Sequence, residues 1–118
     1  NLKELSANNC KGIIGINVNG CYGLSSITVT ESSALYINAD NCSNLYIVTV
    51  SNNVYSVGVG TETVDFSSVE GFESSKLGDI NGGTCTSGVF TFNAGSTEIV
   101  YRYLLANGIY GEFIIRYN

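Results

Sequence analysis

The chain has 118 residues, of which 44% are hydrophobic and 13% are charged, and its formal net charge is −5. This length fits one domain or a short repeat array with a cap, and the hydrophobic fraction is high enough for a folded core. The five cations are scattered and form no basic stripe of the kind that binds nucleic acid, so we expect no nucleic-acid binding. No apolar run is long enough to span a bilayer, so we expect no membrane insertion.

Short triplets, each with a residue of small or polar character between two apolar ones, recur through the first sixty residues. Each triplet alternates as a strand with one buried face does, and turn-forming residues separate the triplets. The density of Gly, Asn, Ser and β-branched residues argues against helices. The triplets cover residues 5–7, 16–18, 27–29, 37–39, 48–50 and 57–59.

Every second triplet shares its outward chemistry, which predicts a coil of about 21 residues with two strand-bearing sides. The inward aliphatic residues would then stack along the axis. Because Thr also favours strands by itself, the hydroxyl-rich set has a purely structural interpretation as well as a functional one. We call the first outward set the hydroxyl face and treat it as the candidate binding face; it comprises Ser6, Asn8, Thr28, Thr30, Thr49 and Ser51. We call the second set the amide side; it comprises Asn17, Asn19, Asn38, Asp40, Gly58 and Gly60.

The cysteines follow the same repeat, since Cys21 and Cys42 each lie six residues before a triplet of the hydroxyl face. Neighbouring strands are roughly 4.8 Å apart and disulfides join Cα atoms roughly 4.4–6.8 Å apart. The spacing therefore allows a Cys21–Cys42 disulfide, with a stacked pair of buried thiols as the alternative. Nothing in the spacing supports a bridge between Cys10 and Cys85. Without His or a C-x-x-C pair, we expect no metal site.

The second half also has β patterning, and its last two strands are expected at 98–105 and 109–117 around Asn107-Gly108, a strong hairpin signal. Aromatic residues concentrate here, which predicts a small antiparallel β-domain over residues 63–118 that caps a repeat domain over residues 1–62. Leu2 and Leu5 begin the first repeat at once, without a comparable cap. We therefore expect either a removed upstream region or pairing of this open end with another subunit.

The first sixty residues resemble the L-x-x-L-x-C-x-x-N-x-L-x-x-L-D-V-S repeat of bacterial surface leucine-rich-repeat proteins, the internalin-like group. The matching segments are 1–9, 13–19, 21–29 and 42–45, and the chain departs from the pattern at the repeat cysteine (Ala7, Val29, Val50) and the repeat aspartate (Asn17, Asn38). The segments 64–67, 71–76, 82–84, 89–92 and 97–101 resemble the β-rich tail that follows such repeats. The resemblance implies an exported cell-surface protein, a short leucine-rich-repeat β-solenoid, and repeats that bind a partner without catalysis.

Catalytic groups are sparse, because no His can serve a Ser nucleophile and no G-x-S-x-G occurs. Carboxylate pairs could in principle do acid–base chemistry, but Glu70 with Glu73 and Asp65 with Glu62 fall in polar turns where solvation is expected. No calcium-loop pattern surrounds the remaining aspartates. We therefore expect no enzyme, no catalytic residue, no cofactor and no metal.

The sequence thus predicts an all-β, non-enzymatic, extracellular module of a bacterial cell surface that binds a protein or glycan ligand. One alternative is a structural subunit that assembles head-to-tail through the uncapped end. A further alternative is ice binding by the Thr/Ser rows of the hydroxyl face.

Overall fold

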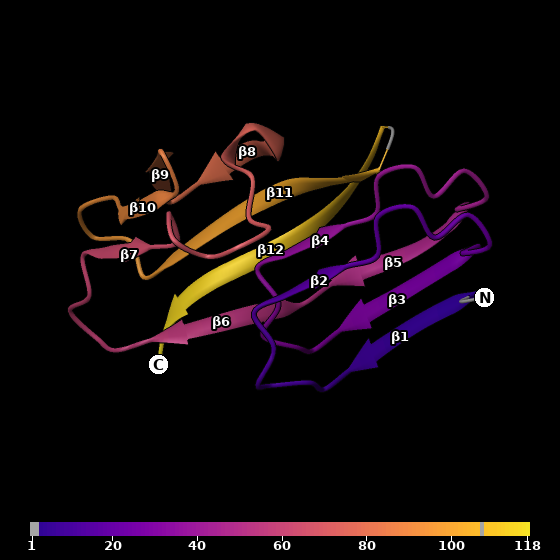
Figure 1. The fold of residues 1–118 in the computed structure, drawn as a ribbon. Coiled ribbons are helices and arrows are strands. Elements are labelled where there is room, and N and C mark those ends of the chain that lie inside the picture. Colours follow the sequence, from indigo (N-terminus) through magenta and orange to yellow (C-terminus); the bar gives the residue numbers. More distant parts are fainter. Residues whose placement is uncertain (1–2, 107) are drawn as a thin grey trace.

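The computed structural model describes residues 3–106 and 108–118, and this part of the chain is all-β (Figure 1). Leu2, expected to begin the first repeat, and Asn107, expected in the hairpin turn, lie outside the described residues. Within the described ranges no helix has the length and apolar character of a membrane span. The elements are β1 (Glu4–Asn8), β2 (Gly15–Asn17), β3 (Ser26–Thr30), β4 (Tyr36–Asn38), β5 (Ile47–Ser51), β6 (Asn53–Val57), β7 (Thr63–Asp65), the 3₁₀ turn η1 (Ser74–Lys76), β8 (Leu77–Asn81), β9 (Gly83–Thr86), β10 (Val89–Phe92), β11 (Glu98–Ala106) and β12 (Ile109–Tyr117).

The first five strands form two parallel sheets, ordered β1-β3-β5 and β2-β4. Leu5 pairs with Ile27, which pairs in turn with Val48, so the chain returns to the same position after one intervening strand. The same offset joins β2 to β4. Inward side chains of the central strands are fully buried, as Ile27 on β3 and Ile37 on β4 show. These pairings confirm the grouping of five of the six triplets.

Left-handed backbone positions recur with the same period, which explains why the turns repeat. Asn9, Glu31 and Asn52 each follow a strand of the β1-β3-β5 sheet, and all three have φ between 54° and 60°. Gly20 and Asn41 take the corresponding conformation after β2 and β4. Gly and Asn adopt positive φ at low cost, so the turn residues seen in the sequence have a conformational reason to recur.

The expected strand at residues 57–59 is wrong, because the second sheet ends at β4. After Asn52 the chain enters β6, which pairs in parallel with β12 from Phe113↔Asn53 to Tyr117↔Val57. The β11–β12 hairpin also reaches the second sheet, since the Ala39 amide donates to the Leu105 carbonyl at 2.8 Å. The hairpin therefore occupies the place that a third strand of the second sheet would have filled.

The C-terminal half forms two further sheets, ordered β6-β12-β11-β8 and β7-β10-β9. The hairpin strands match the expected ranges closely, and their inward residues Phe113 and Ile115 are fully buried. One hydrophobic cluster joins residues from both sides of residue 62. Tyr101 ties the halves together, because its buried hydroxyl donates to the Leu35 carbonyl at 2.7 Å.

Candidate functional site

The hydroxyl face lies on the outer side of the β1-β3-β5 sheet, and the parallel register gathers its six residues into two rows. Ser6, Thr28 and Thr49 are direct cross-strand partners in the first row. Asn8, Thr30 and Ser51 are partners in the second row, where the Thr30 hydroxyl donates to Asn8 Oδ1 at 2.8 Å. All six side chains are exposed or half-buried. The structure therefore brings together every residue that the sequence assigned to this face.

Exposed aromatic and aliphatic side chains border these rows, and sequence reasoning missed them. Tyr22 is 65% exposed and Tyr46 is 74% exposed, each in the turn that leads into a strand of this sheet. Ile47, 49% exposed, points outward with Thr49 because residues two apart on a strand share a face. The Asn44 side-chain amide donates to the Tyr22 carbonyl at 2.6 Å and fixes the two turns against each other. The available signal was a Tyr in each of the two turns that lead into the neighbouring strands β3 and β5.

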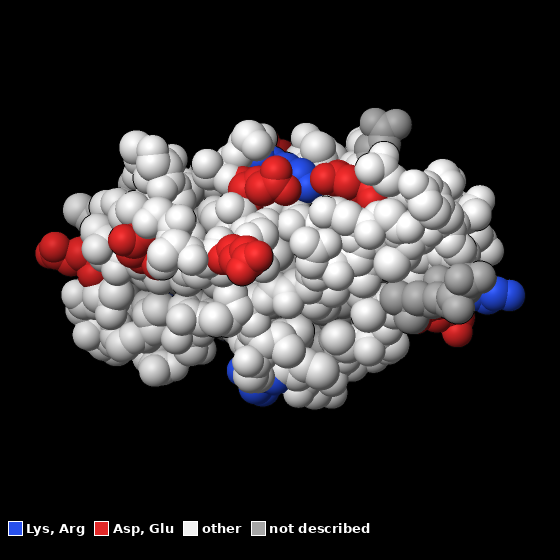
Figure 2. All heavy atoms as spheres, in the orientation of Figure 1, with Lys and Arg blue, Asp and Glu red and all other residues white. Residues whose placement is uncertain are grey.

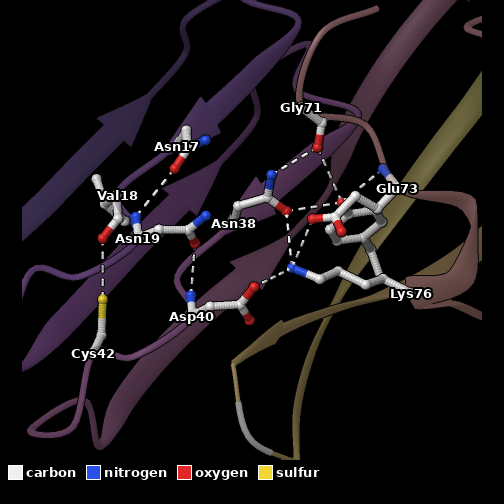
Figure 3. A network of polar contacts seen from close by, with 10 residues as sticks. Asn17, Val18, Asn19, Asn38, Asp40, Cys42, Gly71, Glu73 and Lys76 are labelled. Atoms are coloured by element: carbon white, nitrogen blue, oxygen red, sulfur yellow. Dashed lines mark hydrogen bonds and ion pairs between the residues drawn. The ribbon is translucent and has the colours of Figure 1, made fainter.

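The amide side differs from expectation at β4, where the structure covers Asn38 (Figure 3). Asn38 was expected to face outward but is 1% exposed. Its amide donates to the Gly71 carbonyl at 2.7 Å, and its Oδ1 accepts from the Tyr103 hydroxyl at 2.8 Å and from Lys76 Nζ at 3.3 Å. The segment between β7 and β8 therefore lies over β4, while Asn17 on β2 remains exposed.

Lys76 fixes this covering segment by charge. Its Nζ lies 2.7 Å from Asp40 Oδ2 and 3.2 Å from Glu73 Oε2, and its side chain is only 11% exposed. Burial disfavours the charged ammonium, but the hydrogen bonds and ion pairs with both carboxylates outweigh burial and raise the pKa of Lys76. Every buried side-chain N or O atom in the described residues has a hydrogen-bond partner. We interpret the cluster as an internal clamp, because its groups are already satisfied by one another.

Two of the carboxylates considered for acid–base chemistry, Glu73 and Asp65, have other polar partners in the structure. Glu73 is held by Lys76, whereas Glu70 is exposed. Asp65 accepts hydrogen bonds from the Ser67 hydroxyl and backbone amide, which lower the pKa of Asp65. In residues 3–106 and 108–118, no group of three or more His, Cys, Asp or Glu side chains is arranged to hold a metal ion.

The four cysteines are free thiols in the structure, so Cys21 and Cys42 form the unbridged alternative. Cys42 is 6% exposed and donates to the Val18 carbonyl at 3.1 Å, whereas Cys21 is half-buried. Burial raises the pKa of the Cys42 thiol.

Uncharged atoms cover most of the molecular face in Figure 2, and three of the five cations of the chain lie in ion pairs. Comparison with protein-family models, with curated proteins and with solved structures found no match. Function is therefore inferred from the chain's own geometry and from the repeat that its sequence resembles.

Proposed function

We propose that the first part of the chain is a short β-solenoid of leucine-rich-repeat type and that its hydroxyl face binds a partner. The solenoid interpretation is supported by parallel pairing of β1, β3 and β5 and of β2 with β4, each across one intervening strand. Recurrence of positive φ at Asn9, Glu31 and Asn52 supports it independently, because equivalent turns are expected in successive coils.

The observation that carries the binding proposal is the contrast between the two sides. The amide side is closed over β4 by the Lys76 clamp, whereas the hydroxyl face is open and bordered by Tyr22 and Tyr46. Tyrosine gives a large amphipathic contact area with few rotatable bonds, and it is enriched where binding energy concentrates. Hydroxyl and amide groups on rigid strands add directional hydrogen bonds. This combination fits a protein or glycan ligand.

The proposal includes no catalysis and places the protein outside the cell, on a bacterial surface. Location rests on the resemblance of the repeats to surface leucine-rich-repeat proteins and on the low charge of the chain. The absence of His among all 118 residues favours binding over chemistry, as do the contacts of Glu73 with Lys76 and of Asp65 with Ser67.

Head-to-tail assembly is the second candidate, and half-buried apolar residues of the first coil favour it. Leu5, Ala7 and Ile16 remain partly exposed where the equivalent residues of the next coil are buried. The opposite end is already occupied by the β11–β12 hairpin, which pairs with β6 and whose Leu105 carbonyl accepts from the Ala39 amide. A second copy would therefore need a different surface at that end, which favours the binding proposal.

The test compares two surfaces of the same protein. Wild type is screened against panels of purified extracellular protein domains and of glycans by biolayer interferometry. The double variant Thr28→Arg/Thr49→Arg places two large cations on the hydroxyl face, and Thr84→Arg/Thr86→Arg provides a matched pair of exposed substitutions on β9.

The proposal predicts a binder whose affinity falls at least about tenfold with the hydroxyl-face variant and is unchanged with the β9 variant. A binder that loses affinity only with the β9 variant would contradict it, as would a complete absence of binders. Light scattering of the wild type over a concentration series separates head-to-tail assembly from a monomeric binder. Thermal hysteresis that the hydroxyl-face variant abolishes would favour ice binding instead.

A further inference from the structure

Cys21 and Cys42 occupy the same position in two successive turns. Each backbone amide donates to the carbonyl three residues earlier, at 3.2 Å for Cys21 and 3.3 Å for Cys42. Each carbonyl accepts from the amide of the leucine three residues later, at 3.0 Å and 3.1 Å respectively. The two cysteines therefore have matching local geometry, and their side chains leave the backbone from equivalent places.

The two turns are also in direct contact on both sides of the cysteines. The Gly20 amide donates to the Asp40 carbonyl at 2.7 Å, and the Asn44 side chain donates to the Tyr22 carbonyl at 2.6 Å. The Cys42 thiol points toward the first of these turns, where it donates to the Val18 carbonyl at 3.1 Å (Figure 3). The same thiol also lies near the backbone of Cys21. Parallel neighbours separated by roughly 4.8 Å fall within the Cα separation that a disulfide spans.

We propose that Cys21 and Cys42 are an oxidative modification site, at which a low-molecular-weight disulfide such as oxidised glutathione converts the two thiols into a bridge between successive turns. Cys21 is the more exposed of the two, so its thiolate attacks the reagent first, forms a mixed disulfide and releases one glutathione thiolate. The Cys42 thiol then loses its proton and attacks the Cys21 sulfur, which releases the second glutathione. Two protein thiols are oxidised, one reagent disulfide is reduced to two thiols, and the Cys42 hydrogen bond to Val18 is lost.

The other two cysteines serve as internal controls. Cys10 follows β1 and donates weakly to the Asn8 carbonyl at 3.7 Å. Cys85 lies on β9, where its cross-strand partner is Phe90. Neither has a cysteine in an equivalent place in a neighbouring repeat, so glutathione should cap Cys10 or Cys85 without forming a bridge.

The experiment treats the reduced wild-type protein with oxidised glutathione, digests it without reduction and maps the disulfide-linked peptides by mass spectrometry. The expected result is a linked pair containing Cys21 and Cys42, with the loss of two hydrogen atoms and no retained glutathione. Urea unfolding of the oxidised protein should show an unfolding equilibrium constant lowered about a hundredfold, the effect expected for closing a loop of this length.

A Cys10→Ser/Cys85→Ser variant should form the bridge equally well, and adding Cys21→Ser to it should abolish bridge formation. Stable mixed disulfides at Cys21 and Cys42, a bridge that involves Cys10 or Cys85, or an unchanged unfolding constant would each overturn the proposal. The wild-type peptide map decides the question even if the serine variants fold poorly.

Discussion

Asn53 joins two successive repeats from inside the protein, and its removal gives a direct measure of how strongly they are coupled. The side chain is fully buried at the start of β6. Its Oδ1 accepts from the Ser32 hydroxyl at 2.7 Å and from the Ser32 amide at 3.2 Å, while its Nδ2 donates to the Val29 carbonyl at 3.0 Å. Asn53→Ala leaves all three of these groups without their partner.

The expected loss follows from these three bonds. A buried hydrogen bond contributes about 1 kcal/mol net, and a group left unsatisfied costs about 1–3 kcal/mol. The variant should therefore lose about 3 kcal/mol of unfolding free energy. A domain of this size has about 5–15 kcal/mol available, so the variant should still fold at 25 °C.

Urea denaturation followed by circular dichroism measures the change, with Asn93→Ala as the matched control because Asn93 is exposed. The control should shift the unfolding free energy by less than about 0.5 kcal/mol. In a double-mutant cycle, Ser32→Ala with Asn53→Ala should lose about 1 kcal/mol less than the sum of the single variants. A loss below about 1 kcal/mol for Asn53→Ala, or simple additivity, would refute the buried contact between repeats.

Three further stability predictions follow from backbone conformation and from the Lys76 clamp, and all are measured by denaturant unfolding. Glu31→Asn should stabilise the protein by about 0.5–1 kcal/mol, because Glu31 has φ of 54° and Asn tolerates that conformation better; destabilisation would contradict the assigned turn. Gly82→Ala should lose more than about 2 kcal/mol of unfolding free energy, because the new Cβ would collide with a backbone carbonyl of β11. Gly95→Ala is the control, since Gly95 has a similar φ and open space around it, and it should lose about 1 kcal/mol. Equal losses in the two variants would contradict the close approach of β11 to Gly82. Lys76→Met should lose about 1 kcal/mol of unfolding free energy at neutral pH, because it removes the contacts of Lys76 with Asp40 and Glu73. The pKa of Lys76 is raised in the folded state, so its stabilisation is complete below the ordinary lysine value of 10.5 and lost as pH rises through the folded pKa. A wild-type-to-variant gap that stays constant through that range would contradict the clamp.

The positions of the first five strands and their grouping into two sheets could be predicted from sequence, because the information is local and periodic. The alternation at Ile27 and Val29 predicts which face of the strand is buried. The recurrence of similar triplets predicts which strands are neighbours in a sheet. The terminal hairpin could also be predicted from sequence, since its strands flank an Asn-Gly pair. For the same reason, the six residues of the hydroxyl face could be placed on one surface before the structure was known.

The contacts that cover Asn38 on the amide side could not be predicted, because they depend on segments distant in sequence. Asn38 is the same residue type as the exposed Asn17. It is buried because Lys76 and Tyr103, which are distant in sequence, pack against it and donate hydrogen bonds to it. The triplet at residues 57–59 failed for a related reason. Its local pattern resembles the earlier triplets, but β6 pairs with β12 and does not join the sheet that contains β4.

The tyrosines that border the hydroxyl face could not be assigned to it from the sequence, because alternation identifies the faces of strands only. Tyr22 and Tyr46 lie in turns, where no periodicity assigns a side chain to a face. Their exposure is a property of the packed turns, in which Leu24 and Leu45 take the buried positions.

The central claim is that the first five strands alternate between two sheets, so that chemically alike strands become parallel neighbours. The alternative is an antiparallel meander, in which strands adjacent in sequence would pair. Nuclear Overhauser contacts in isotopically labelled protein distinguish the two arrangements directly. The account predicts backbone contacts from Thr28 to both Ser6 and Thr49, with a parallel pattern throughout residues 26–30. Antiparallel contacts between residues 26–30 and 36–38 would contradict it.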